Sequence, residues 1–333
     1  MKRATVKEVA KMAGVSTATV SNVLTGRKYV SDEVKERVHS VMKKLNYQPN
    51  VIAKSLRLKE SRLIGLLISD VANSFFSSVV RGIEYELAAN NYHVLLCNTD
   101  SNVEKEREYL ETLIGKRIDG LIVSSAGNSG DYFRSLQQTG VPIVFLNRCP
   151  PFMNCDVIMS NNISGAYSAT EHLIRHGYRK IAIITGEPTI STGKDRLTGY
   201  MRAHEDYGIQ VHEDLIKEGR FDTESGYLMM KELMEQEKKP DAVFISNNSM
   251  TLGGYKYLKE KGIRIPDQVA LVAFDDPEWA ELVDPPITAV RQQSYELGVQ
   301  AARLILDSIK DKKNNRDIMY MDTTLIVRHS CGC

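Results

Sequence analysis

The sequence predicts an α/β protein in which a small all-helical head precedes a two-lobed core of doubly wound parallel sheets. Two observations predict this fold. Three short amphipathic helical segments occupy the first 46 residues. From Leu63 onward, short apolar runs rich in β-branched residues alternate with amphipathic segments, which is typical of parallel strands with crossover helices. We therefore expect a head at 1–49, a linker at 50–60 and a core at 61–333.

Charge is distributed unevenly along the 333 residues, although the formal net charge is only +1. Residues 1–60 contain 13 Lys and Arg against 5 Asp and Glu, a net charge of +8. A basic head indicates a polyanionic partner. No apolar stretch approaches the roughly 20 residues that span a bilayer, and charges interrupt the opening segment where a secretory signal would be apolar. We expect a cytoplasmic protein with no membrane partner.

Metal and redox motifs are not indicated by the cysteine spacing. The five cysteines form no CxxC pair, so we interpret them as reduced thiols outside any closed zinc site. His172 and His176 have the i, i+4 spacing of a helical metal site, but the Glu of an HExxH motif is missing. We interpret both as surface histidines and expect neither a metal nor a cofactor.

The first two helices of the head form a helix-turn-helix pattern. Thr5 and Glu8 have capping-box spacing at the start of a helix expected at 6–12. A glycine turn and the N-cap residue Ser16 then precede a second helix at 17–24. Two short helices joined by such a turn are typical of DNA-binding heads.

The third helix is expected to begin after the N-cap residue Ser31 and to stop at Asn46, shortly before a proline. The second helix carries short side chains, which let its N-terminal half lie deep in a major groove. Asn22 is suited to a bidentate pair with adenine, and Thr17 and Ala18 to contacts with thymine methyl groups.

The segment from Thr5 to Leu56 resembles, without a gap, the DNA-binding head of the LacI/GalR family of repressors. In that family the following hinge helix orders on DNA and inserts a leucine into the minor groove, which implies that Leu56 is the wedge. A helix of about seven residues is too short to be stable alone, so DNA and a partner hinge must stabilise it. The predicted DNA-contacting residues are Thr5, Ser16, Thr17, Ala18, Thr19, Ser21, Asn22, Tyr29, Asn50, Ala53, Lys54 and Leu56.

The core has too many expected strands for one sheet of ordinary width, so two doubly wound lobes are the simplest arrangement. It resembles the periplasmic sugar-binding-protein core of the same family, and the resemblance therefore covers essentially the whole chain. Family topology implies a first lobe at about 62–160 and 291–319 and a second at about 161–290 and 320–331.

Ligands of open α/β sheets bind at the carboxyl ends of strands, which makes the polar residues after each apolar run candidates. The family resemblance adds three phenylalanines as aromatic walls for a polyhydroxylated ligand. The predicted effector-binding residues are Asn73, Phe75, Phe76, Ser124, Asn147, Arg148, Thr192, Arg196, Phe221, Asn247, Asp275 and Gln292, with Asp70 a further polar candidate.

Asn147 departs from the ribose-type relatives, which carry an aspartate directly before the arginine. Arg148 and Arg196 then face Asp275 alone, so the predicted site has a charge of about +1, which favours a carboxylate or phosphate on the ligand. We hypothesise a sugar acid or another acidic sugar derivative, with a neutral pentose or hexose as the alternative.

The sequence thus predicts a homodimeric repressor of a carbohydrate-catabolism operon, which binds a pseudopalindromic operator in double-stranded DNA under allosteric control. One alternative is a catabolite-control regulator that uses a phosphorylated carrier protein, because Tyr295 and Arg303 match positions used in that branch. A sugar-binding transport protein is another alternative. An enzyme is not expected, because GxGxxG, P-loop and GxSxG motifs are missing and the neighbours Asp275 and Asp276 should point to opposite sides.

Overall fold

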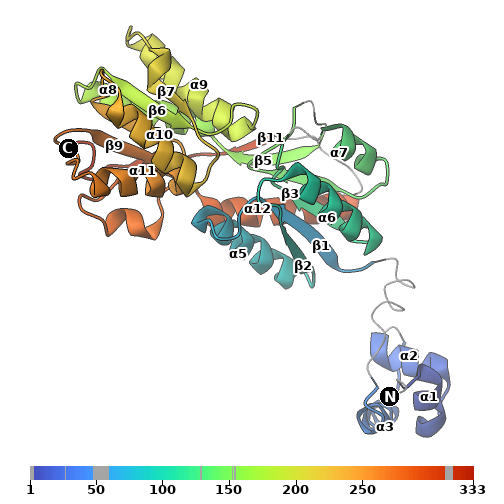
Figure 1. Cartoon of the computed structure of the whole chain (residues 1–333). Helices are drawn as coiled ribbons and strands as arrows, with labels where there is room; N and C mark the ends of the chain where they lie inside the picture. The colour runs from blue at the N-terminus through green and yellow to red at the C-terminus, as the bar shows by residue number, and fades with distance from the viewer. Residues whose placement is uncertain are drawn as a thin grey trace. The chain divides into compact units, whose positions relative to one another are not determined.

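A computed structural model describes residues 4–26, 28–47, 60–127, 130–151, 153, 155–311 and 318–333 (Figure 1). The chain divides into two compact units, of which the first ends at Ser61 and the second begins at Arg62. No helix within these described ranges is long and apolar enough to cross a membrane.

The head is a three-helix unit around a small apolar core that includes Val9, Val20 and Val38. The predicted capping box is present, because the Thr5 backbone N–H donates to the Glu8 carboxylate at 2.7 Å and the Glu8 N–H donates to Thr5 Oγ1 at 3.4 Å. This reciprocal pair satisfies amide donors that a helix start leaves unpaired. The helices are α1 (Val6–Ala13), α2 (Thr17–Thr25) and α3 (Asp32–Lys44).

The turn between α1 and α2 has the predicted chemistry. Gly14 adopts a left-handed conformation with φ 65°, and Ser16 Oγ accepts a hydrogen bond from the Thr19 N–H at 3.0 Å. Ser31 is the N-cap residue of the third helix, as predicted, although its side chain makes no cap hydrogen bond. Asp32 and Glu33 in the first turn of α3 instead interact favourably with the helix dipole.

Two six-stranded sheets form the core, as the alternation of apolar runs predicted. The first sheet is parallel throughout, and in the second only β12 is antiparallel to its neighbour β10. The first sheet has the order β11 (Ile318–Met321), β5 (Asp156–Ser160), β4 (Ile143–Leu146), β3 (Gly120–Val123), β1 (Leu63–Ile68), β2 (His93–Asn98). The second has the order β12 (Thr324–Ile326), β10 (Thr288–Arg291), β9 (Ala270–Phe274), β8 (Ala242–Ile245), β6 (Ile181–Thr185), β7 (Ile216–Glu218).

Helices cover both faces of each sheet, which explains why the central strands are apolar on both sides. On the first sheet, α5 (Ser74–Ala89) and α12 (Ser294–Asp311) lie opposite α6 (Val103–Gly115) and α7 (Gly130–Gln137). On the second, α8 (Asn162–Arg175) and α9 (Ser191–Asp206) lie opposite α10 (Thr223–Glu235) and α11 (Asn248–Glu260). Two 3-10 turns, Glu213–Leu215 and Glu278–Glu281, complete the second lobe.

The chain passes between the lobes three times, after β5, after β10 and after β11. The third passage lies between Met321 and Thr324, whereas the family topology implied a passage after residue 319. The strand β11 therefore belongs to the first sheet, and β12 to the second.

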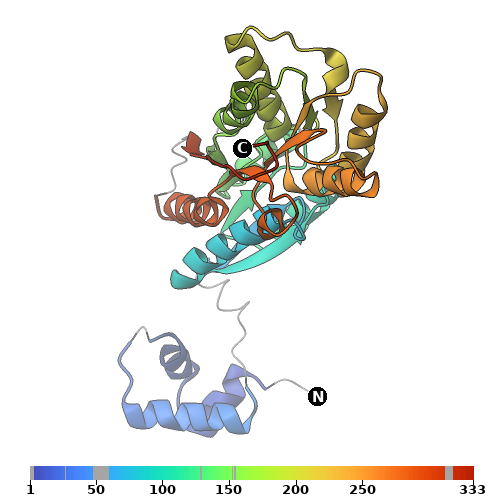
Figure 2. The ribbon, with the colours of Figure 1, turned by 90° about the vertical axis from the view of Figure 1, so that its left-hand side faces the viewer.

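Helices α5 and α12 cross closely on the first lobe (Figure 2) because both carry a glycine at the contact. A Cβ atom at Gly298 of α12 would overlap the Val79 carbonyl oxygen, and one at Gly82 of α5 would overlap the Tyr295 carbonyl oxygen. Backbone atoms cannot rotate away as side chains can, so the separation of these helices depends on the two glycines.

We expect Gly298→Ala to lower the free energy of unfolding by about 1–3 kcal/mol, because the added methyl group forces the two helices apart. Urea denaturation measures this change. Gly115→Ala is the matched control, since a Cβ there meets no atom within 4 Å. Equal effects of the two substitutions would show that the crossing of α5 and α12 is not tightly packed.

Candidate functional site

The carboxyl ends of the strands of both sheets face the cleft between the lobes. Strand order reverses between β1 and β3 in the first sheet and between β6 and β8 in the second, and such switch points are where open α/β sheets bind ligands. The two ends lie against one another, since Asn73 after β1 donates to Asn248 Oδ1 after β8 at 2.8 Å.

Seven buried polar atoms in the described part of the chain have no hydrogen-bond partner in the protein, and all seven lie at these strand ends or in the first turn of the helix that follows. An unpaired buried polar atom costs about 1–3 kcal/mol, so native proteins rarely keep several together. Their clustering indicates a site for a polar ligand. The atoms are Ser124 Oγ, Asn147 Oδ1, Arg148 Nε, Ser160 Oγ, Thr192 Oγ1, Ser246 Oγ and Gln292 Oε1.

Two buried guanidinium groups lie in the cleft against aromatic rings. Arg148 Cζ is 4.6 Å from the centre of the Phe221 ring, and Arg196 Cζ is 3.8 Å from that of Phe274. Neither forms an ion pair with any residue that the structure describes. Burial lowers the pKa of each to about 10, and for Arg148 the neighbouring Arg196 adds to this effect. Both remain cationic at neutral pH.

Arg196 is oriented by the second lobe. Its Nε donates to Asn162 Oδ1 at 2.8 Å, and Nη1 donates to the Ser246 carbonyl oxygen at 2.5 Å. Arg148 has one side-chain partner in the first lobe, because Nη1 donates to Ser101 Oγ at 3.3 Å. The hydrogen-bond partners of the two cations are thus neutral groups, and the nearby Asp275 carboxylate partly balances their charge.

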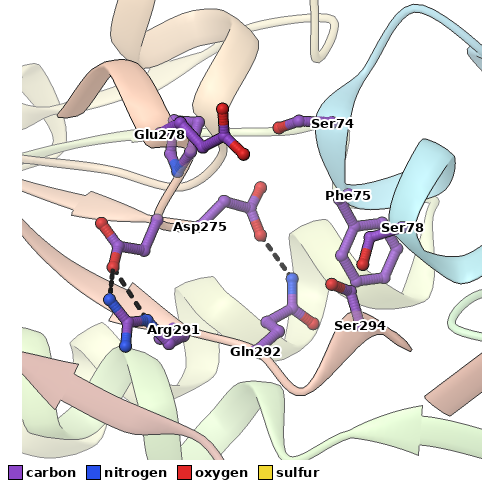
Figure 3. Close-up of a pocket in the computed structure, with 10 residues that line it drawn as sticks. Ser74, Phe75, Ser78, Asp275, Glu278, Arg291, Gln292 and Ser294 are labelled. Atoms are coloured by element: carbon purple, nitrogen blue, oxygen red, sulfur yellow. Dashed lines mark hydrogen bonds and ion pairs between the residues drawn. The ribbon is translucent and has the colours of Figure 1, made fainter. Parts of the chain in front are cut away.

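Asp275 and Gln292 form the polar edge of a pocket of about 200 Å³ (Figure 3). The Asp275 carboxylate accepts hydrogen bonds from the Asn248 backbone N–H at 3.2 Å and from Gln292 Nε2. This contact orients the Gln292 amide so that Oε1 stays unpaired. Ser74, Phe75 and Ser78 of α5 line the opposite side.

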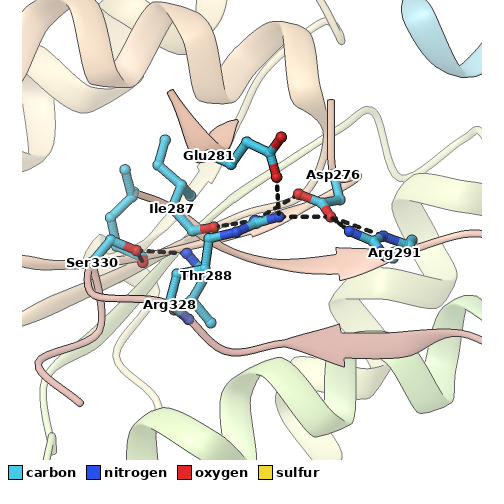
Figure 4. A network of polar contacts seen from close by, with 8 residues as sticks. Asp276, Glu281, Ile287, Thr288, Arg291, Arg328 and Ser330 are labelled. Carbon is cyan, nitrogen blue, oxygen red and sulfur yellow. Dashed lines mark hydrogen bonds and ion pairs between the residues drawn. The ribbon is translucent and has the colours of Figure 1, made fainter. Parts of the chain in front are cut away.

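Asp276 lines the same pocket, but its carboxylate has other partners than Asp275 and belongs to a separate ionic network (Figure 4). Its carboxylate, 2% exposed, accepts from Arg328 Nη1 at 2.7 Å and from Arg291 Nη2 at 2.6 Å. Arg328 also donates to the Ile287 carbonyl oxygen. The network joins the ends of β9, β10 and β12 and fixes the backbone that carries Asp275.

Three predicted effector residues have structural partners. Asn73 caps α5 by accepting from the Phe75 N–H at 3.0 Å, and Asn247 caps α11 by accepting from the Met250 N–H at 2.9 Å. Phe76 is buried in the core of the first lobe, where it packs edge to face on Phe75. The main role of these three residues is therefore to hold the helices α5 and α11 and the core of the first lobe in place beside the site.

Phe221 has a left-handed backbone with φ 64°, and its carbonyl oxygen accepts from Asn247 Nδ2 at 3.2 Å. Its ring occupies the space that a side chain at position 186 would fill, because a Cβ on Gly186 would overlap it. A glycine after β6 is therefore required to place the aromatic surface against Arg148.

Sequence reasoning missed Ser160, Asn162, Ser246 and Asn248. Ser160 and Ser246 carry unpaired hydroxyl groups, and Asn162 and Asn248 hold Arg196 and Asp275. The runs DVIMS and AVFIS end in these serines, so the rule that selected Ser124 applies equally to them.

The predicted DNA-contacting residues of the head differ in how far they are exposed. Ser16, Thr17 and Ala18 are exposed at its N-terminal end, and Ser21 and Asn22 are half-buried on the next turn. Thr19 Oγ1 lies 2.9 Å from Ser16 Oγ, and Tyr29 is 91% exposed. Thr5 is exposed at its cap position. Asn50, Ala53, Lys54 and Leu56 lie outside the described residues.

A helix-turn-helix head on a two-lobed core with a polar, cationic cleft defines a ligand-controlled DNA-binding regulator. Residues 5–50 match a family model described as bacterial regulatory proteins, lacI family. Residues 61–327 match one described as periplasmic binding proteins and sugar binding domain of LacI family.

Three individual proteins that resemble this chain are likewise transcriptional regulators or repressors. The HTH-type transcriptional repressor PurR of Pasteurella multocida is 35% identical over 328 residues, which cover 98% of each chain. A structure described as a transcriptional regulator CelR–cellobiose complex has 31% identity and a TM-score of 0.76, covering 98% of this chain and 100% of that chain. The Lac repressor dimer bound to operator and the anti-inducer ONPF has 26% identity and a TM-score of 0.88, covering 99% of each chain.

The chain therefore belongs to the LacI family. It is a DNA-binding transcriptional repressor and not an enzyme, and regulators of this family bind operator DNA and a small-molecule effector. The alternative of a transport protein is set aside, because the head matches the regulatory family model.

We expect Thr192→Val to leave the free energy of unfolding unchanged or to raise it by up to about 1 kcal/mol, because the hydroxyl group that it removes has no partner. Thr170→Val is the matched control. It removes a buried hydroxyl that donates to the Ala166 carbonyl oxygen at 2.8 Å, and should cost about 1 kcal/mol. Chemical denaturation measures both, and an equal loss at Thr192 would show that its hydroxyl is structural.

Proposed function

We propose that this protein is a homodimeric repressor of carbohydrate catabolism whose effector is an acidic sugar bound between the lobes. The observation that carries the effector class is the pair of buried guanidinium groups, Arg148 and Arg196, without an ion-pair partner among the described residues. A ligand carboxylate or phosphate would supply the missing counter-charge.

The polar lining supports a polyhydroxylated ligand. The unpaired serine and threonine hydroxyls can each donate and accept, and the unpaired Asn147 and Gln292 oxygens accept from ligand hydroxyl groups. Asp275 is the one acidic residue among the predicted effector contacts, and it already accepts two hydrogen bonds. The net charge of these contacts is therefore about +1.

The lobes touch through a reciprocal amide pair beside the site. Asn73 Nδ2 donates to Asn248 Oδ1 at 2.8 Å, and Asn248 Nδ2 donates to Asn73 Oδ1 at 2.9 Å. Asn248 also touches Asp275 through its backbone N–H. A ligand that engages Asp275 would thus alter the group that holds the lobes together, and lobe closure would change the spacing of the two hinges in a dimer.

In the head, we propose that the N-terminal half of α2 reads base edges and that each protomer recognises one half of a pseudopalindromic operator. Asn22 would pair with adenine, and Leu56 would kink the centre of the site.

A second candidate is a catabolite-control regulator with a protein co-regulator. Tyr295 is 41% exposed, and its ring centre lies 6.4 Å from that of Tyr85, so the two form an exposed aromatic surface on α5 and α12. Arg303 forms an ion pair with Glu86 at 3.2 Å on the same pair of helices. The unpaired atoms of the cleft favour the small-molecule effector.

Matched sugars test the effector class. We expect glucuronate and galacturonate to raise the melting temperature at concentrations at which glucose and galactose do not, because only the acids neutralise the buried arginines. Arg148→Gln should weaken binding of the acids more than binding of the neutral sugars. Titration calorimetry gives the affinities. Neutral sugars that bind as tightly as their acids would contradict the proposal.

DNA recognition is tested by in vitro selection from random duplexes. We expect a pseudopalindromic consensus from the wild type, and Asn22→Ala should lose preference at one position per half-site at a cost of about 1–3 kcal/mol. Glu36→Ala, an exposed position on α3, is the control and should keep the consensus.

Affinity for the selected duplex should fall by about 10³ or more between 50 and 200 mM salt if about 6 phosphates per dimer are neutralised. Binding that does not depend on salt would contradict a phosphate-dominated interface.

A further inference from the structure

Four metal-binding side chains that the sequence separates lie together on the second lobe. His172 and His176 occupy adjacent turns at the C-terminal end of α8, and Cys331 and Cys333 follow β12. Cys333 Sγ lies 3.0 Å from His176 Nε2, 3.3 Å from His172 Nε2 and 2.9 Å from Cys331 Sγ. The ligand atoms of His172, Cys331 and Cys333 all lie within 4.8 Å of one another.

This set of donors has the chemistry of a structural zinc site. Zinc prefers four tetrahedral ligands of the thiolate and imidazole types, and Cys2His2 sets are common. Bond lengths of about 2.3 Å to sulfur and 2.0–2.1 Å to nitrogen correspond to ligand–ligand distances of roughly 3.3–3.8 Å in a tetrahedron. The separations around Cys333 need to open by less than about 1 Å to reach that range, a change that side-chain rotation can supply.

The backbone already orients two of the donors. His176 Nδ1 lies 2.8 Å from the His172 carbonyl oxygen, so the proton belongs on Nδ1, and Nε2 presents its lone pair toward Cys333. Metal-bound histidines commonly make such an outer contact.

Cys331 is fully buried beside a strand of the second sheet. Its carbonyl oxygen accepts from Tyr178 Oη at 3.1 Å, and Sγ lies 3.0 Å from Thr288 Oγ1. The preceding Ser330 is held by β9, since its carbonyl oxygen accepts from the Leu271 N–H at 2.8 Å. The position of one ligand is thus set by the fold.

We propose that His172, His176, Cys331 and Cys333 bind one Zn²⁺ ion and that the ion fastens the segment after β12 to α8. All four ligands come from the protein, so the site is closed and structural. This differs from our interpretation of the sequence, in which the histidines lie free on the surface. The ion would anchor the C-terminal end of α8, whose first residue, Asn162, holds Arg196 at the cleft.

Cobalt substitution in the reduced, metal-free, full-length protein tests the site. We expect one equivalent of Co²⁺ to produce the visible absorption of a tetrahedral cobalt–thiolate centre, and one equivalent of Zn²⁺ to abolish it. Cys333→Ser and His176→Gln should each weaken Co²⁺ binding by at least about tenfold. Cys97→Ser and His93→Gln are the controls, since both residues lie outside the cluster, and they should bind as the wild type does.

The stabilising role gives a second, independent measurement. Zn²⁺ should raise the melting temperature of the wild type and of both controls, but not that of Cys333→Ser, whose exposed position allows the variant to fold. No cobalt–thiolate absorption in the reduced wild type would overturn the proposal. Purification of the chain with a Cys331–Cys333 disulfide that excludes metal, or equal loss of binding in the control variants, would also overturn it.

Discussion

The burial of Arg148 and Arg196, neither of which forms an ion pair with a described residue, is the constraint on which the cleft depends. Removing a charge from water costs several kcal/mol unless it is paired. Here the cost is reduced by two aromatic rings, by the amide of Asn162 and the carbonyl oxygen of Ser246, and by the nearby Asp275 carboxylate. A ligand that pairs with the arginines would remove the remaining cost of burying their charge, and the free energy gained would contribute to binding.

In the proposed function, the same strand ends would connect ligand binding to lobe movement. Asp275 has a left-handed backbone, and the Asp276 network on one side and Asn248 on the other hold it in place. Asn248 in turn pairs with Asn73 across the cleft. One short chain of contacts therefore joins the ligand site to the interface between the lobes, as a regulator that couples two sites requires.

Much of the fold could be predicted from local sequence, because strands buried on both faces read as continuous apolar runs and several helix starts carry a cap residue, such as Thr5 and Ser16. The strand-end rule selected Ser124, Arg148 and Thr192, each of which carries a buried polar atom without a partner in the protein. It could not find the Asn73–Asn248 pair, since these residues are 175 positions apart and only the closed tertiary structure brings them together.

The cluster of His172, His176, Cys331 and Cys333 also could not be predicted from local sequence. Neither the i, i+4 histidines nor the Cys-x-Cys segment is a sufficient metal motif alone, and 157 positions separate His176 from Cys333. Ser31 occupies the predicted N-cap position without a side-chain cap hydrogen bond, because a residue type that favours caps does not guarantee that bond.

The central claim is that the ligand in the cleft controls DNA binding through the lobes. Calorimetric titration with the tightest-binding sugar acid tests this claim most directly. The sugar acid is titrated once into the free protein and once into the protein saturated with its selected operator duplex. Linkage requires that the two sugar affinities differ by the same factor by which the sugar changes the affinity for the duplex. We predict a factor of about 5–150 in both measurements. Equal sugar affinities in the presence and absence of the duplex would contradict the account.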